Sequence, residues 1–74
     1  MELLNLEGLN CPLPVLKTKK FLANLDHGTT VSITTTDPAS IQDFKDFCAK
    51  TDHTLVSQEI NQETKIITTI IRAK

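Results

Sequence analysis

Segments of strand character alternate with segments of helical periodicity along the chain, and this alternation most limits the folds open to it. Apolar residues that recur at helical spacing predict one helix over about Pro12–Leu25 and a second from Pro38 to about Lys50. Short apolar or alternating runs predict strands at residues 2–6, 30–36, 54–60 and 65–72. Because βα crossovers are right-handed, the order β-α-β-α-β-β predicts a two-layer α/β sandwich, a four-stranded mixed sheet with both helices on one face.

The length of the chain, 74 residues, predicts a single domain over residues 1–74. A chain this short buries only about 60% of the surface that its unfolded form exposes. Its apolar fraction is 39%, with no Trp or Tyr, so one core must form from Leu, Ile, Val and three Phe. We therefore expect a functional site on the surface and not in a large buried pocket.

The charge balance bears on possible partners. The formal net charge is −1, which disfavours binding to nucleic acid by neutralisation of phosphates. No segment approaches the ~20 apolar residues that a membrane-spanning helix needs, and the first residues lack the basic run of a signal peptide. We expect a cytoplasmic monomer with reduced cysteines, no membrane partner and no direct nucleic-acid binding.

Cys11 directly precedes two closely spaced prolines, Pro12 and Pro14. Pro12 restricts Cys11 to an extended backbone, which predicts that Cys11 is the N-cap of the first helix. The helix dipole would then favour the thiolate and moderately lower the pKa of Cys11, whereas a nearby Glu7 would oppose ionisation. One interpretation of these residues is a reactive thiol that the two prolines hold in one geometry. The alternative is a cysteine that only packs beneath the helix start.

The other chemically versatile side chains have structural interpretations. Cys48 lies on or beside the apolar stripe of the second helix, so we expect it to pack, with a resolving or relay cysteine as the alternative. His27 and His53 follow the predicted helix ends and would act as C-terminal caps, while Asp37 would be an N-cap. The spacing of Cys11 and Cys48 contains no metal-binding motif, so we expect no metal and no cofactor.

Three lysines, Lys17, Lys19 and Lys20, cluster on the first predicted helix. Such a cluster is often a solvated helix face. The alternative function is a docking patch for an acidic partner, and both interpretations remain open here.

Three segments, in order, resemble the motifs of the TusA/SirA-like family of sulfur carriers. Residues 8–18 (GLNCPLPVLKT) are similar to its opening signature, residues 36–39 (TDPA) to its second marker, and residues 43–48 with His53 to its third. The resemblance implies the same β-α-β-α-β-β sandwich. It also implies that Cys11 accepts persulfide sulfur from a cysteine desulfurase or similar donor and relays it to an acceptor, sometimes for tRNA 2-thiolation.

In this family Pro12 and Pro14 would form the structural frame of the carrier cysteine. The resemblance implies a sulfurtransferase-like carrier and not a stand-alone enzyme. Asn10 and Leu13, which flank the motif positions, differ from the residues usual in TusA itself, so donor, acceptor and pathway stay open. The alternative function is a non-catalytic regulatory or protein-interaction module of the same fold.

Overall fold

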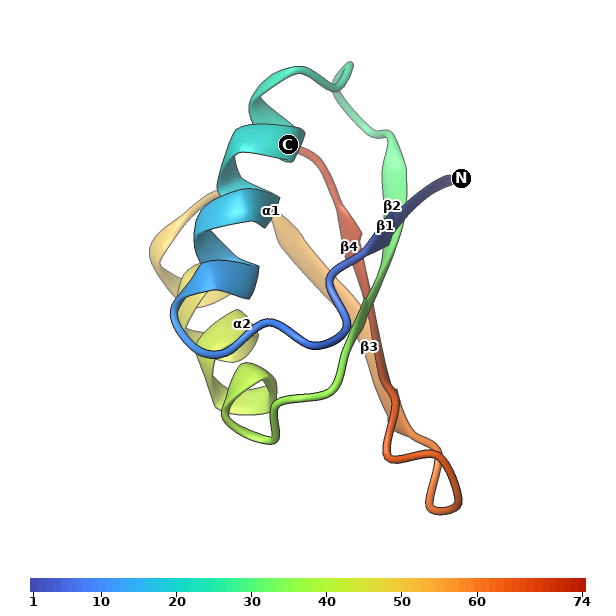
Figure 1. Cartoon of the computed structure of the whole chain (residues 1–74). Helices are drawn as coiled ribbons and strands as arrows, with labels where there is room; N and C mark the ends of the chain where they lie inside the picture. The colour runs from blue at the N-terminus through green and yellow to red at the C-terminus, as the bar shows by residue number, and fades with distance from the viewer.

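A computed structural model describes the whole chain, residues 1–74 (Figure 1). It contains, in chain order, β1 (Glu2–Asn5), α1 (Leu13–Ala23), β2 (Thr30–Thr35), α2 (Ala39–Lys50), β3 (Thr54–Ile60) and β4 (Ile67–Arg72). The predicted order β-α-β-α-β-β is therefore confirmed. Neither helix has the length and apolar character that crossing a bilayer requires.

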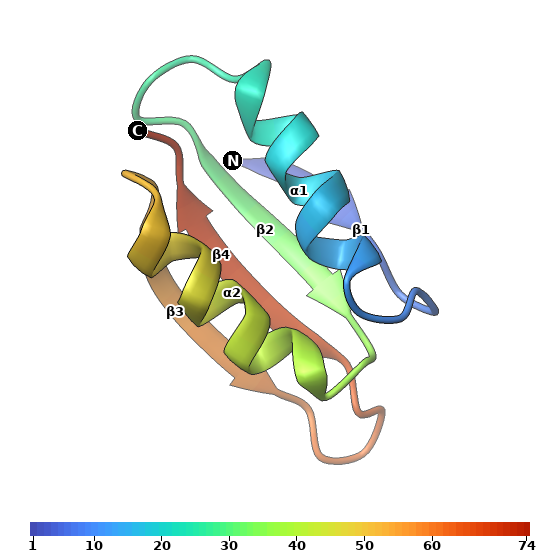
Figure 2. The same ribbon diagram turned by 90° about the vertical axis from the view of Figure 1, so that its left-hand side faces the viewer.

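The four strands form one mixed sheet in the order β1-β2-β4-β3. Strands β1 and β2 are parallel, whereas β4 runs antiparallel to both β2 and β3. Figure 2 shows both helices in front of the same face of this sheet, α1 near β1 and β2, and α2 over β4 and β3. The predicted two-layer sandwich with two helices on one face is confirmed.

The two central strands alternate between a buried and a half-buried face. Their register pairs Val31 with Ile71 and Ile33 with Thr69, and all four side chains are fully buried on the helix side. Because side chains alternate along a strand, the intervening residues point away from the helices. They are largely Ser and Thr: Ser32, Thr34, Thr68 and Ile70.

The helices close the core with a few large side chains. Leu22 of α1 and Phe44 and Phe47 of α2 are buried against the inner face of the sheet. Phe44 is completely inaccessible to solvent. The position of α2, and of every polar residue on its first turns, therefore depends on how these aromatic rings pack.

Some predicted boundaries differ from the observed ones. Helix α1 ends at Ala23, and β4 begins at Ile67. The side chain of Asn61 stabilises the loop between β3 and β4. Its Oδ1 accepts hydrogen bonds from the backbone N–H groups of Glu63 and Thr64. Lys65 in this loop has φ +64°, so the connection is longer than the four-residue turn predicted from residues 61–64.

Replacement of Phe44 by Ala should remove about 3–5 kcal/mol from the free energy of unfolding, because it leaves a cavity at the centre of the core. Chemical denaturation measures this loss. The matched control is Leu16→Ala on α1, where the side chain is 54% exposed and the expected change is within about 0.5 kcal/mol. Equal midpoints for the two variants would contradict the packing described.

Candidate functional site

Cys11 lies in the connector between β1 and α1, where its side chain is exposed. The N-cap of α1 is Pro12, and the helix itself begins at Leu13. The backbone N–H of Leu13 donates to the carbonyl oxygen of Asn10 at 2.9 Å, closing a turn that holds Cys11 outside the helix. The prediction that Cys11 is the N-cap was therefore wrong: this turn places the helix boundary one residue further along the chain.

The carboxylate of Asp37 connects this turn to the second helix. Its Oδ2 accepts the backbone N–H of Cys11 at 2.8 Å, and its Oδ1 accepts that of Ala39 at 3.0 Å. Pro38 occupies the N-cap position of α2, so Asp37 is not the N-cap that the sequence predicted. Asp37 nevertheless satisfies the first N–H group of the helix. Its bond to Cys11 depends on tertiary contact, and nothing in the local sequence signals it.

A second bond from the same segment reinforces the turn. The hydroxyl oxygen of Thr36 accepts the backbone N–H of Gly8 at 2.9 Å. Gly8 has φ +85°, a conformation that side-chain-bearing residues rarely adopt. Thr36 and Asp37, which directly follow β2, thus fix both ends of the segment from Gly8 to Cys11.

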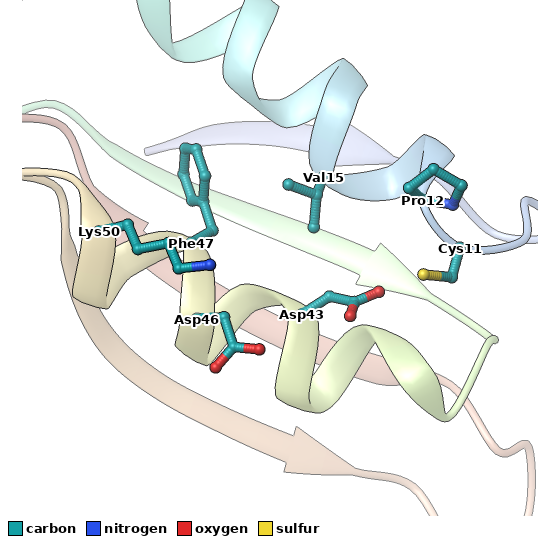
Figure 3. A pocket seen from close by; sticks show the side chains of 7 residues that line it. All are labelled: Cys11, Pro12, Val15, Asp43, Asp46, Phe47 and Lys50. Carbon is teal, nitrogen blue, oxygen red and sulfur yellow. The ribbon is translucent and has the colours of Figure 1, made fainter.

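Cys11 lines a pocket between the two helices, which Figure 3 shows. Apolar atoms come from both helices and charged groups from α2 alone. The lining residues are Cys11, Pro12, Val15, Asp43, Asp46, Phe47 and Lys50. In Figure 3 the sulfur of Cys11 points toward α2 and faces the carboxylate of Asp43. The thiol is therefore presented to a hollow with acidic groups on one wall.

These carboxylates oppose ionisation of Cys11. Hydrogen bonding to Asp43 raises the pKa of the thiol, and partial desolvation and the charges of Asp43 and Asp37 add to the shift. The predicted lowering of the pKa was wrong. Cys11 lies outside the helix end that was expected to stabilise its thiolate, and two carboxylates from another part of the chain act in the opposite direction. Sequence reasoning had considered only Glu7.

Cys48 has a different environment. It is half-buried and packs against the hydrophobic core, and this burial raises the pKa of its thiol. It does not line the pocket of Cys11. The predicted packing role of Cys48 agrees with these contacts.

The two histidines lie beside the end of β4 and do not cap the helices as predicted. The ring Nδ1 of His53 accepts the backbone N–H of Lys74 at 3.1 Å, and Nδ1 of His27 bonds to the carbonyl oxygen of the same residue. The ring of His53 also stacks on Phe47, with 5.7 Å between centroids. No three His, Cys, Asp or Glu side chains gather closely enough to share a metal ion.

The three lysines of the predicted cluster are all exposed, but they do not share one feature of the surface. Lys17 and Lys20 line a second hollow between β1 and α1, together with Leu4, Leu6, Phe21 and Asn24. Lys19 lies outside this hollow. The structure thus brings two of the three lysines together, at an apolar groove separate from the Cys11 pocket.

The fold and this site define a class: a small α/β sandwich that presents one exposed thiol between its two helices. The family model described as "Sulfurtransferase TusA" matches residues 2–72. The chain therefore belongs to the TusA family of sulfur carriers.

Similar proteins support this assignment. "Sulfur carrier protein TusA" of Allochromatium vinosum is 39% identical over 56 residues, which cover 76% of this chain and 74% of that protein. A protein of Neisseria meningitidis serogroup A, whose name contains the words "sulfur carrier protein", is 34% identical over 73 residues, 99% and 96% of the two chains. A SirA-like protein of Desulfitobacterium hafniense has the same fold, with a TM-score of 0.85 and 24% identity over 99% of this chain and 97% of that one.

Asp37→Asn should lower stability at neutral pH, because an amide offers one acceptor oxygen to two N–H donors. Those two bonds lower the pKa of Asp37 below its ordinary 3.8, so the charged form stabilises the fold. This stabilisation is complete well above pH 3.8 and is lost as the pH falls through the lowered folded-state value. The denaturation midpoints of the wild type and of Asp37→Asn should differ at neutral pH and converge as the pH falls below the folded-state pKa of Asp37. A constant difference at every pH would contradict the assigned bonds.

Proposed function

We propose that Cys11 is the carrier residue. It accepts the outer sulfur of a persulfide on a cysteine desulfurase or similar donor and relays that sulfur to an acceptor protein. The observation that carries this proposal is the exposed thiol of Cys11, held by backbone bonds at the mouth of a pocket in a chain of the TusA family. Thiolation of tRNA is one destination that fits such a carrier.

The proposed transfer is an exchange of sulfur between two thiols. The Cys11 sulfur attacks the outer sulfur of the donor persulfide, a new S–S bond forms, and the donor's own S–S bond breaks. The donor is left as a thiol, and Cys11 carries the persulfide, so no external oxidant or reductant is required. Discharge to the acceptor repeats the same exchange in the other direction.

The surroundings of Cys11 support presentation to a protein partner. Pro12 lines the pocket, and Pro14 is buried at the start of α1, so these two residues can frame the cysteine rigidly. Lys17 and Lys20, with their apolar groove, offer a docking surface to an acidic partner, whereas Lys19, the third lysine of the predicted patch, lies outside the groove. We place this activity in a cytoplasmic, monomeric domain of residues 1–74.

One observation favours a second function. The carboxylates near Cys11 raise its pKa, which favours the protonated thiol, a weaker nucleophile than the thiolate. A non-catalytic interaction or regulatory module would need no thiolate at all. In that case the groove of Lys17 and Lys20 would be the functional surface, and Cys11 would be dispensable.

Incubation with a cysteine desulfurase and cysteine should add the mass of one sulfur atom to the protein. Cys11→Ser should abolish the gain, because the attacking sulfur is then missing. Cys48→Ser is the matched control and should gain sulfur as the wild type does, since that thiol lies outside the pocket. Intact-mass spectrometry under non-reducing conditions measures the three proteins side by side.

If Cys11→Ser kept the mass gain and Cys48→Ser lost it, the carrier would be Cys48, and the proposal for Cys11 would be contradicted. Absence of sulfur on every variant, combined with full activity of Cys11→Ala in cells, would favour the interaction module.

A further inference from the structure

The charged groups around Cys11 are unevenly distributed. Asp43 and Asp46 supply two carboxylates to the pocket, and Lys50 supplies one ammonium group. Asp37 lies behind the turn, where both of its carboxylate oxygens accept backbone hydrogen bonds. The pocket therefore keeps an excess of negative charge, and the one ion pair in the structure, between Lys74 and Asp52, does not involve Asp43.

The position of Asp43 is set by the core. It is half-buried and directly precedes Phe44, which is fully buried beneath α2. The helix therefore holds this carboxylate on the wall of the pocket, where it faces the sulfur of Cys11 (Figure 3). A carboxylate fixed beside a thiol stabilises the protonated form, as a hydrogen-bond acceptor and as a like charge to the thiolate.

We propose that Asp43 is a positioning residue that keeps Cys11 protonated in the free protein, and that a cationic side chain of the sulfur-donating partner enters the pocket, pairs with Asp43 and releases the thiolate. This inference rests on the proposed carrier function. In this proposal, Cys11 accepts sulfur only after the partner's cation has paired with Asp43.

The lining of the pocket suits such a partner side chain. Val15, Phe47 and Pro12 provide apolar surface for the methylene stem of a Lys or Arg, while Asp43 and Asp46 provide acceptors for its charged end. Guanidinium groups pair especially well with carboxylates because their donors match the two oxygens. Charge complementarity therefore favours a cationic residue over an acidic or neutral one.

The proton and electron balance of the step is simple. When the cation pairs with Asp43, the Cys11 thiol loses its proton to water or to the leaving thiolate of the donor. The Cys11 sulfur supplies the electron pair of the new S–S bond, and the donor thiolate departs with the pair of the broken one. The reaction consumes one persulfide and one thiol and yields one of each.

The test measures the reactivity of Cys11 toward iodoacetamide as a function of pH, in a Cys48→Ser background that leaves one thiol. Asp43→Asn should move the midpoint of the profile to lower pH, and each unit of that shift raises the thiolate fraction at neutral pH about tenfold. Asp46→Asn is the matched control and should leave the midpoint nearly unchanged, because Asp43 and Asp37 are the carboxylates that raise the pKa of this thiol. An unmoved midpoint in Asp43→Asn overturns the proposal.

A second arm tests the partner's cation. The rate of sulfur transfer from a cysteine desulfurase to Asp43→Asn should be equal to or lower than the wild-type rate, because the partner already neutralises Asp43 in the complex. A transfer rate that rises in proportion to the alkylation rate overturns this part of the proposal. If wild-type Cys11 takes no sulfur while the alkylation profile still shifts, the carrier function fails and the role of Asp43 in thiol protonation stands.

Discussion

The burial of one face of β2 is the constraint on which the rest of the structure depends. This strand lies between β1 and β4, and its inward side chains Val31, Ile33 and Thr35 are fully buried. Its register fixes where the strand ends, and that end delivers Thr36 and Asp37 to the loop before α1. The hydrogen bonds of these two residues then hold the backbone of the loop that contains Cys11. The core thus positions the thiol through the segment that leaves the central sheet.

The fold could be predicted from the sequence because periodicity is a local property. The alternation of Val31, Ile33 and Thr35 and the helical spacing of Phe44 and Phe47 determine which face of each element is buried. The order of these elements then leaves few topologies. Helix ends were less predictable, since several turn geometries fit the same few residues, and the N-cap of α1 fell on the residue after the expected one.

The candidate site could be predicted only in part. Cys11 could be identified because Pro12 and Pro14 lie next to it in the sequence and are visible without a structure. The carboxylates that determine its protonation come from Asp37 and Asp43, which approach it only when α2 packs beside α1. The local sequence shows the helix dipole but not these charges, so the predicted change in the pKa of Cys11 had the wrong sign. The available signal was the family resemblance, since Asp37 lies in its second segment and Asp43 in its third.

A thiol held protonated suits a carrier better than it suits an enzyme. Thiolate character and exposure make a cysteine prone to oxidation, so an exposed carrier cysteine benefits from remaining a thiol until a partner arrives. Under the proposal for Asp43, the acidic pocket that slows reaction of the free protein also supplies the charge that a cationic partner would recognise. In this account, membership of the TusA family explains what is carried, and the pocket explains when the transfer is allowed.

The proposed residence of sulfur on Cys11 can be checked by mapping the transferred sulfur on the wild-type protein. The protein would be loaded by a cysteine desulfurase with isotopically labelled cysteine, alkylated to trap the persulfide, digested and sequenced by tandem mass spectrometry. The account predicts the labelled sulfur on the peptide that contains Cys11, and its disappearance after a chase with an acceptor thiol. Labelled sulfur on the Cys48 peptide alone would contradict it.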